Sequence, residues 1–220
     1  MFKKTLLAAL ISGAMISVVQ AAETQPNGYL FGNLGRADAS TPDFVKNTNA
    51  EFRDVATGAS AVLGENVGFD SSFESKDTAF KIGAGLQLNQ HIGIEFQYVD
   101  LGEIDYKASF NALGTNLSAG RADASTDGLG LNLVGTLPFD RFKLFGKVGY
   151  HKLKTKVRLQ SDLFDEYSRD SATEWVTSYG VGASYAFTRA VEVVGEYERY
   201  NDVANEYDVD LASIGLRYNF

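Results

Sequence analysis

Cysteine is absent from the 220 residues, and proline occurs only three times. Without cysteine the protein has no disulfide bonds, so its stability must come from burial and hydrogen bonding. Long apolar runs are also missing after the first two dozen residues, which excludes a membrane-spanning helix from the rest of the chain. The chain is instead rich in glycine, with 22 residues, and 12% of it is aromatic.

Basic residues are outnumbered by acidic ones, 20 against 28, which gives a net charge of -8. Two of the basic residues, Lys3 and Lys4, precede an apolar run from Leu6 to Val19 and small residues up to Ala21, the pattern of a secretory signal peptide. We predict that residues 1–21 are removed, which leaves 18 basic residues and a net charge of about -10. Such an acidic exported chain is not expected to bind nucleic acid.

Residues 22–220 are predicted to form one domain, because no flexible linker interrupts them. They show no helical periodicity, and eight segments instead alternate between apolar and polar residues with the period of two that strands require. The eight segments are GYLFGNLG, AFKIGAGLQL, IGIEFQYVD, LGLNLVGTL, FKLFGKVGY, WVTSYGVGASYAF, VEVVGEYERY and the terminal LASIGLRYNF.

The connections between these segments differ in length. They are tight near residues 89–91, 138–141 and 188–190 and mostly long at 39–76, 103–125, 155–172 and 201–207. Short turns at one end and long loops at the other are typical of outer-membrane barrels. We therefore predict an all-β fold, an eight-stranded antiparallel up-and-down transmembrane β-barrel.

Two other architectures remain open. A further hairpin within residues 39–76 would make the barrel ten-stranded and its lumen wider. A β-sandwich is the other alternative, but it would have to bury Lys81, Glu95 and other charged residues or expose its aromatic faces.

Several of the segments resemble a known family. GIEFQYVDLG, TLPFDRFKLFGKVGY, YGVGASYAFTRAVEVVGEYERY and LRYNF are similar to the eight-stranded outer-membrane β-barrel family that includes the transmembrane domain of outer membrane protein A. The resemblance covers nearly the whole exported chain and implies a location in the outer membrane of a Gram-negative cell. Because the chain stops at Phe220, we do not expect the separate peptidoglycan-binding domain of larger members.

Strand parity directs a mixture of charged and polar side chains into the lumen. Eight strands enclose a space just wide enough for side chains to fill, and an isolated buried charge is costly, so these side chains are expected to pair and plug the barrel. The alternative is a narrow porin-like channel whose ion preference they set. The resemblance implies that Glu95, in a G-x-E-x-x-Y stretch, is interior and ion-paired. The predicted inward residues are Lys81, Glu95, Gln97, Asn132, Lys147, Glu192, Glu196 and Arg217.

A run of cations follows the fifth segment in HKLKTKVRLQ. Lys152, Lys154, Lys156 and Arg158 share the parity of the outward-facing Tyr150, so we predict that they point away from the barrel at the height of lipid head groups. There they are candidates for contact with lipopolysaccharide phosphates. The alternative is a solvated strand end whose lysines only protect an exposed edge.

The predicted loops contain a repeat and two acidic clusters. GRADAST occurs at residues 35–41 and again at 120–126, and each copy is expected to continue its strand beyond the bilayer. A role as a surface adhesin is a further alternative, because exposed loops often carry binding residues. The acidic stretches SDLFDEYSRD and NDVANEYD lack the spacing of a calcium loop, so no metal site is predicted.

Candidates for catalysis are few, since the chain has only two histidines. His91 lies in a tight turn, and His151 lies at the top of the fifth segment, where Glu174 of the sixth segment is a candidate partner. Neither is accompanied by a nucleophile signature such as G-x-S-x-G. We predict that the protein is not an enzyme and uses no cofactor.

The predicted role is structural and surface-exposed: a monomer that supports envelope integrity, contacts outer-membrane lipids and lipopolysaccharide, and presents its loops. Tyr218 and Phe220 resemble the C-terminal signal that the barrel-assembly machinery recognises. That machinery and periplasmic chaperones are therefore the expected partners during biogenesis.

Overall fold

The computed structural model describes residues 27–112, 115–161 and 166–220, and the predicted signal peptide lies outside these ranges. Within them the chain forms nine strands and one helix. In chain order these are β1 (Asn27–Ala39), α2 (Asp43–Leu63), β2 (Val67–Glu74), β3 (Lys76–Gln87), β4 (Ile92–Ala112), β5 (Thr115–Phe139), β6 (Phe142–Ser161), β7 (Glu166–Ala186), β8 (Val191–Val203) and β9 (Tyr207–Asn219).

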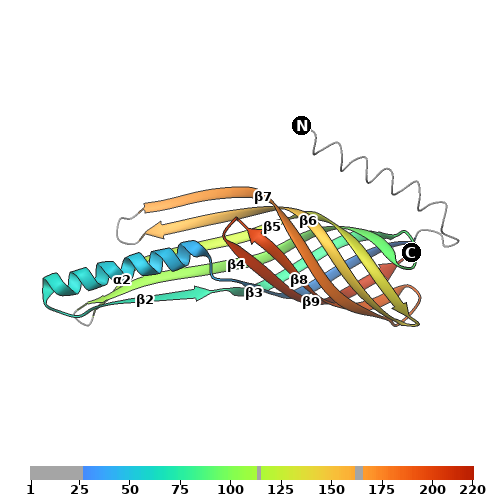
Figure 1. Ribbon diagram of the computed structural model, residues 1–220, viewed down its shortest axis with the longest axis horizontal. Coiled ribbons are helices and arrows are strands. Elements are labelled where there is room, and N and C mark those ends of the chain that lie inside the picture. Colours follow the sequence, from blue (N-terminus) through green and yellow to red (C-terminus); the bar gives the residue numbers. More distant parts are fainter. Residues whose placement is uncertain (1–26, 113–114, 162–165) are drawn as a thin grey trace, which may run out of the picture.

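Eight of the strands close into a barrel, which Figure 1 shows from the side. Each pairs with its neighbour in antiparallel fashion in the order β1, β3, β4, β5, β6, β7, β8 and β9, and β9 pairs with β1 to complete the ring. The backbone N–H of Phe220 donates to the carbonyl oxygen of Gly28 at 2.9 Å, which joins the last residue to the first strand. The predicted eight-stranded antiparallel barrel is confirmed, and the ten-stranded alternative is wrong.

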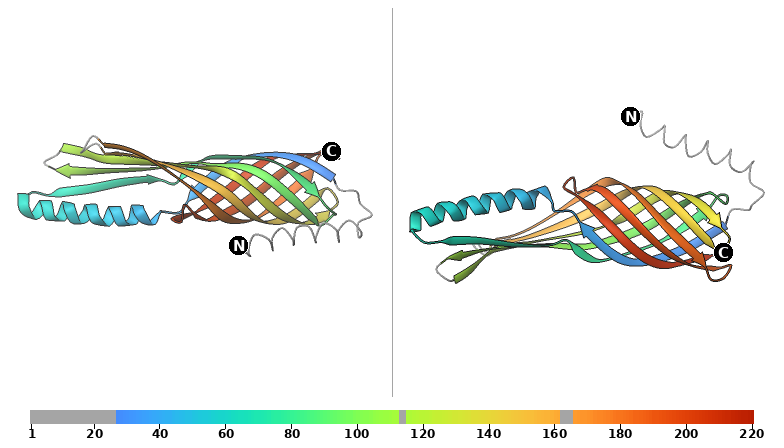
Figure 2. Two further views of the ribbon diagram at one scale, coloured as in Figure 1. Left: turned by 90° about the horizontal axis from the view of Figure 1, so that it is seen from above. Right: turned by 60° about the horizontal axis from the view of Figure 1, so that its bottom comes forward.

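The remaining strand, β2, belongs to a part of the sheet that rises beyond the ring (Figure 2). Among the described residues it pairs only with β4. The outer half of β4 pairs in turn with β5, and the sheet continues by pairing through β6 to β7. We call β2 together with residues 103–112, 115–127, 152–161 and 166–176 the extension. Most of these residues were expected to form long loops, which is wrong because they continue the strands. The pairing of β4 with β5 is interrupted there only by register shifts after Asp100 and after Ala108.

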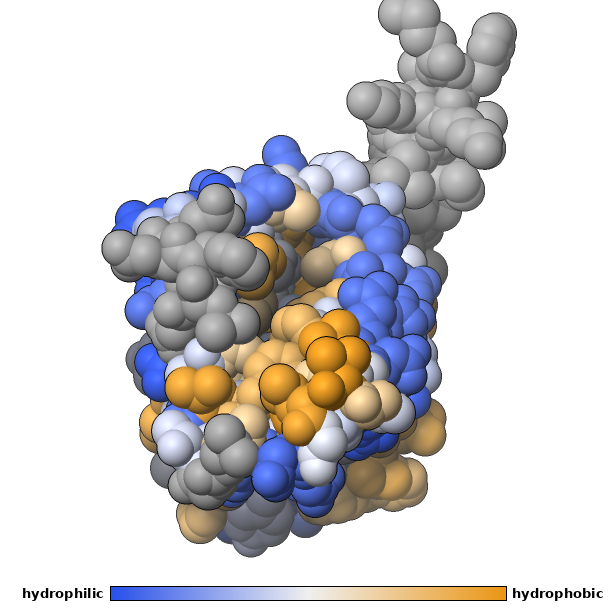
Figure 3. All heavy atoms as spheres, turned by 90° about the vertical axis from the view of Figure 1, so that its left-hand side faces the viewer, coloured by the Kyte–Doolittle hydropathy of each residue, from blue (hydrophilic) through white to orange (hydrophobic). Residues whose placement is uncertain are grey.

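A second correction concerns α2, which occupies part of the first predicted loop. No helix was expected, because the apolar stripe of α2 is thin: Val45 and Ala56 are its only buried residues. Phe52 packs edge-on against Phe69 and Phe110 with ring centroids 5.5 Å apart in both pairs. The helix thereby covers the concave face of β2, β4 and β5, and Figure 3 shows apolar residues gathered on this side of the extension within a hydrophilic rim.

No helix in the described part of the chain is long and apolar enough to cross a membrane.

The outer surface of the ring is apolar. On each strand the outward side chains are exposed and hydrophobic, which in water would be a large unfavourable surface and in lipid is the expected one. Near the short turns this surface carries Phe139, Phe142, Phe187 and Phe220, and at the opposite edge Tyr150 and Trp175 stack with ring centroids 4.8 Å apart. These two groups mark the borders of the membrane-facing band.

Glycines on the inner surface make room for aromatic side chains of the adjacent strand. A Cβ atom at Gly85 would collide with the ring of Tyr29, and one at Gly83 would collide with the ring of Phe31. In so narrow a lumen a large ring on one strand requires the absence of a side chain on the next. The glycine content therefore reflects how the interior is filled.

Candidate functional site

All of the residues predicted to face the lumen lie in its interior and are at most 8% exposed. They are Lys81, Glu95, Gln97, Asn132, Lys147, Glu192, Glu196 and Arg217. The antiparallel register brings them from β3, β4, β5, β6, β8 and β9 to a common axis, because residues two apart on a strand point to the same face. The charged members among them form ion pairs, which a confined interior requires.

Glu95 on β4 is the centre of one group. Its Oε1 accepts hydrogen bonds from the hydroxyl of Tyr29 at 2.9 Å and from Nη2 of Arg217 at 3.0 Å, and its Oε2 accepts one from Nζ of Lys147 at 3.2 Å. The guanidinium of Arg217 also lies 4.3 Å from the centroid of the Tyr29 ring. A single carboxylate is thus held by donors from three other strands.

Lys81 is the centre of a second group. It forms ion pairs with Glu196 and with Glu198, the latter at 2.8 Å, and both carboxylates come from β8. Lys147 joins the two groups, since its Nζ lies 2.9 Å from Glu196 as well. Glu198 is fully buried and accepts a hydrogen bond from Ser178 at 3.2 Å, yet it was absent from the predicted inward set. Its parity with Glu196 was the signal that would have identified it.

A hydrogen-bonded layer lies next along the barrel axis. Gln97 donates to the hydroxyl of Tyr200 at 3.1 Å, and its Nε2 lies 3.1 Å from Nε2 of His151. Gly130 leaves the space for the imidazole. Glu174 pairs in register with Leu153 rather than with His151, so the suggested contact between His151 and Glu174 does not form.

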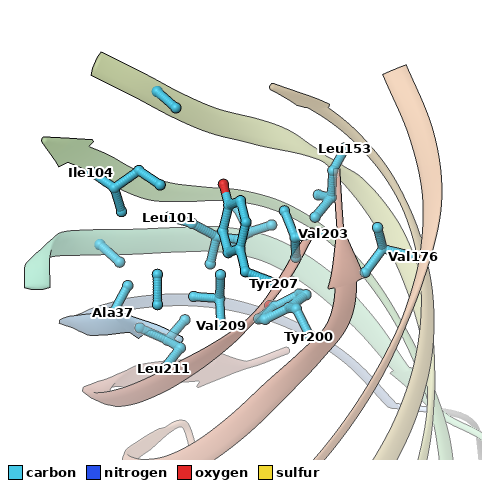
Figure 4. Packing of buried hydrophobic residues seen from close by; sticks show 14 residues of the cluster. Ala37, Leu101, Ile104, Leu153, Val176, Tyr200, Val203, Tyr207, Val209 and Leu211 are labelled. Carbon is cyan, nitrogen blue, oxygen red and sulfur yellow. The ribbon is translucent and has the colours of Figure 1, made fainter. Parts of the chain in front are cut away.

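The outermost layer of the lumen is mainly apolar, as Figure 4 shows, with the hydroxyls of Thr126, Thr155 and Tyr207 hydrogen-bonded to one another within it. Side chains from β4, β6, β7, β8 and β9 meet there and leave a cavity of only about 10 Å³ near Leu101 and Tyr207. A space of this size barely admits one water molecule. The residues of this layer include Val99, Leu101, Leu153, Val176, Tyr200, Val203, Tyr207, Val209 and Leu211.

The opposite end of the lumen holds a smaller polar group around Glu192. This carboxylate accepts hydrogen bonds from Lys143 at 2.5 Å, Ser184 at 2.9 Å and Asn219 at 3.0 Å. A small apolar cluster of Val134, Phe145 and Val194 is also buried in the interior. Along the axis, charged, hydrogen-bonded and apolar side chains thus follow one another.

The four cations that follow the fifth segment form a column on the outside of β6. We call Lys152, Lys154, Lys156 and Arg158 the basic column. All four are exposed and face away from the lumen. Lys156 forms an ion pair with Asp127 at 2.9 Å. The column begins directly above the stacked rings of Tyr150 and Trp175, at the border of the membrane-facing band.

Beside the column, Glu103, Asp105 and Asp123 form an acidic cluster on the outer face of the extension, with one carboxylate oxygen of each within 4.8 Å of the others. Asp105 and Asp123 lie directly opposite each other on β4 and β5. Partial burial and a hydrogen bond with Asp105, together with the charges of Asp105 and Glu103, raise the pKa of Asp123 above its ordinary value of 3.8. This acidic cluster was not predicted from the sequence, because the pairing of β4 with β5 is what brings its carboxylates together.

The first copy of GRADAST ends β1 at the outer edge of the ring, where residues as far as Ala39 still pair with β9, and the second copy lies in the part of β5 that continues beyond the ring. In each copy the alanines point inward and are buried, whereas Arg36 and Asp38, or Arg121 and Asp123, point outward. The repeat thus places the same alternation at two positions of the barrel's outer edge.

Comparison with known families now assigns the fold. Residues 6–220 match the family described as outer membrane protein beta-barrel domain. The chain belongs to this family. The protein is accordingly an integral barrel of the outer membrane of a Gram-negative cell.

Solved structures of other outer-membrane barrels resemble this one. Neisserial surface protein A is 16% identical with a TM-score of 0.54, and the match covers 90% of this chain and 100% of that one. Ail, the attachment invasion locus protein of Yersinia pestis, was solved in complex with the heparin analogue sucrose octasulfate. It is 15% identical with a TM-score of 0.48, and the match covers 88% of this chain and 99% of that one. OprG of Pseudomonas aeruginosa is 13% identical with a TM-score of 0.44, and the match covers 88% of this chain and 96% of that one. A comparison with curated proteins found no match.

Small outer-membrane barrels of this family are mostly non-enzymatic. In this barrel His91 lies in the turn that follows β3, where its N–H donates to the Asn89 side chain, and His151 is fully buried between Gln97 and Tyr200. The imidazole of His91 is exposed, with its Nδ1 3.1 Å from the carbonyl oxygen of Thr136, and that of His151 is buried; among the described residues neither is hydrogen-bonded to a nucleophile, as a general base would be. The absence of catalysis stays a prediction.

The Glu95 group yields the first test. Replacement of Glu95 by Ala should destabilise the barrel by about 3–5 kcal/mol, because it leaves Arg217 and Lys147 buried with fewer carboxylates. Urea unfolding of the refolded barrel in lipid vesicles, followed by the fluorescence of Trp175, the only tryptophan, measures the change. Glu51→Ala, which removes an exposed carboxylate from α2, is the control. Equal midpoints for the two variants would contradict the role assigned to Glu95.

The acidic cluster yields a second test. Because the pKa of Asp123 is raised in the folded protein, its ionisation opposes folding, and the stability of the extension should fall as pH rises from about 4 to 7. Asp123→Asn should remove this loss and increase the protection of β4 and β5 amides from hydrogen exchange at pH 7, with little effect near pH 4. Asp54→Asn on α2 is the matched control. Lower protection at pH 7 in Asp123→Asn than in the wild type would refute the assignment.

Proposed function

We propose that this barrel is a closed structural protein with a surface-exposed role: it supports envelope integrity, contacts lipopolysaccharide and presents its extension to the surroundings. The observation that carries the proposal is the filled lumen. Ion-paired side chains occupy the part nearer the short turns, and apolar side chains occupy the outer part with a residual cavity of about 10 Å³. We therefore assign the function of the protein to contacts made by its outer surface.

The pairing of the interior charges argues against the porin-like alternative. A selectivity lining works through charges that face water and exchange ions. Here Lys81 and Lys147 each contact two or more carboxylates, and Arg217 is bonded to Glu95, so the cations are already neutralised. The apolar layer outside them adds a barrier that an ion cannot cross without losing its hydration.

The basic column supports contact with lipopolysaccharide. It starts beside Trp175, whose ring prefers the border between hydrocarbon and head groups, so Lys152 and Lys154 lie at the depth of phosphates. Lys156 is engaged by Asp127 and contributes less. Lys152, Lys154 and Arg158 form no ion pair with the described residues, although Asp127 and Asp123 on β5 lie directly opposite Lys154 and Arg158. We expect the phosphates to bind through these three cations.

The end of the chain fits recognition during assembly. Phe220 and Tyr218 are 68% and 53% exposed, at the border where β9 meets β1. We propose that the barrel-assembly machinery reads this edge after periplasmic chaperones have delivered the chain, and that the folded protein remains a monomer.

Single-channel recording tests the closed lumen. The chain without residues 1–21, refolded and shown to be folded by a heat-dependent gel shift, should give no conductance steps in a planar bilayer. Stable, reproducible steps that disappear on unfolding would overturn the proposal and favour the porin-like alternative.

A binding measurement tests the lipid contact independently. Each cation near an anionic surface contributes about 1 kcal/mol, so replacing Lys152, Lys154 and Arg158 together by Ala should weaken lipid A binding roughly a hundredfold. Native mass spectrometry of the protein in detergent, with lipid A titrated, measures the dissociation constant. The control replaces Lys46, Arg53 and Arg189, three exposed cations away from the column. An equal loss in both triple variants would contradict a specific contact.

A further inference from the structure

A second charged feature lies farther out on the convex face of the extension. Lys107 on β4 and Arg121 on β5 are direct cross-strand neighbours, and both side chains are exposed. Directly opposed residues have Cβ atoms about 4.5–5.5 Å apart, so two cations in this position repel each other. Among the described residues neither cation forms an ion pair.

These two cations line an open cleft of about 430 Å³, which we call the outer cleft. Its volume lies within the range of clefts that hold small molecules, about 300–1,000 Å³. Polar residues predominate in the lining, with hydroxyl, amide and carboxylate groups beside the two cations, and alanine and glycine are its only apolar residues. The residues are Asp70, Ser71, Ser72, Lys107, Ala108, Ser109, Ser118, Gly120, Arg121 and Gln160.

A β-bulge shapes this cleft. The register between β4 and β5 shifts between Ala108 and Ser109, so that Ala119 on β5 has no partner. Ala119 is buried against the concave face beside Val45 of α2, whereas the residues on either side of it line the outer cleft. Bulges re-aim the side chains around them and are common next to binding sites.

The charge of the outer cleft distinguishes it from the other large cleft at the outer end of the barrel. That second cleft, of about 420 Å³, is lined by Asp43, Asp202, Glu206 and Asp208 with Lys46 as its single cation. The outer cleft has two cations and one carboxylate. Asp105 and Asp123 lie two residues along the same strands from Lys107 and Arg121 and offset part of the repulsion between these cations, but at a longer spacing than that of directly opposed residues.

We infer that the outer cleft binds an anionic saccharide, a sugar that carries phosphate or sulfate. The cations match the anionic group, which would bridge Lys107 and Arg121 and relieve their repulsion, and the hydroxyls of Ser71, Ser72 and Ser109 match the sugar hydroxyls. An apolar ligand would find no large hydrophobic side chain to pack against in this cleft.

The position of the outer cleft favours the core oligosaccharide of lipopolysaccharide over lipid head groups. Arg121 pairs in register with Gln160, eight residues beyond Lys152 on β6, which is roughly 27 Å along the strand. Lys152 lies at the border of the membrane-facing band, so the cleft lies above the phosphates of lipid A, among the sugars. The inference thus rests on the proposed lipopolysaccharide contact for its choice of ligand and adds a second, outer point of contact.

The test uses the refolded protein and four probes in native mass spectrometry: a deacylated, phosphorylated core oligosaccharide, the same oligosaccharide after phosphatase treatment, a sulfated oligosaccharide and lipid A. The double variant Lys107→Ala/Arg121→Ala should bind the phosphorylated core roughly thirtyfold more weakly than the wild type, and phosphatase treatment should have a similar effect. Its lipid A binding should be unchanged. The variant that lacks Lys152, Lys154 and Arg158 should show the reverse pattern, so each proposal can fail without the other.

A stability measurement accompanies the binding assay. Because the two cations repel each other, the double variant should unfold at the same or a higher urea concentration than the wild type, and only the wild type should gain stability when the phosphorylated core is added. If the wild type binds only the sulfated probe and the double variant does not bind it, the outer cleft is still a site for an anionic saccharide. Its ligand is then a sulfated glycan from another cell and not the core oligosaccharide. Unchanged affinity of the double variant for both anionic probes, or an equal loss in Lys46→Ala, would overturn the inference.

Discussion

The pairing of backbone hydrogen-bonding groups determines most of this structure. Within lipid no water can satisfy a free N–H or C=O group, so the strands must close, and β9 pairs with β1 along nearly the whole of both strands. Closure fixes the alternation: lipid-facing side chains are apolar, and the inner ones fill a lumen too narrow for water. The paired charges around Glu95 and Lys81 follow from that narrowness. Beyond the ring the constraint is relaxed, and the extension keeps open edges at β2 and along residues 166–176 of β7.

The same physics explains which parts of the fold could be predicted. Inside the membrane-facing band the period of two is strict, so the strands and their inward residues, Lys147 and Arg217 among them, were identified from the sequence. In the extension the outward side faces water, so the outward side chains are polar and the inward ones are apolar, the reverse of the pattern in the membrane-facing band. Ala122 and Ala124 lie inside while Arg121 and Asp123 lie outside, a composition that also suits a hydrophilic loop. The helix α2 was missed because the concave sheet supplies most of the apolar surface against which it packs.

Parity predicted which residues enter the lumen but not which of them meet. Glu95 bonds to Arg217, 122 residues away, and to Lys147, 52 residues away, and these partners depend on the stagger of the strands around the ring. The opposition of Lys107 and Arg121 depends in turn on two register shifts, one between Asp100 and Glu103 and one at the bulge of Ala119. A sequence read strand by strand contains neither quantity, because both arise from how far one strand slides past the next.

The arrangement of charge separates the interior from the surroundings. The interior ion pairs lie behind the apolar layer of Leu101, Leu153 and Val176, so a ligand on the outside cannot reach them. The outer charges are instead in water, where they are screened beyond about 8 Å at physiological ionic strength. A phosphate near the basic column therefore responds to Lys152 and Lys154 and hardly to the predicted net charge of about -10 of the exported chain. An acidic protein can for this reason attract anions at particular places, provided that its cations are not neutralised by neighbouring carboxylates.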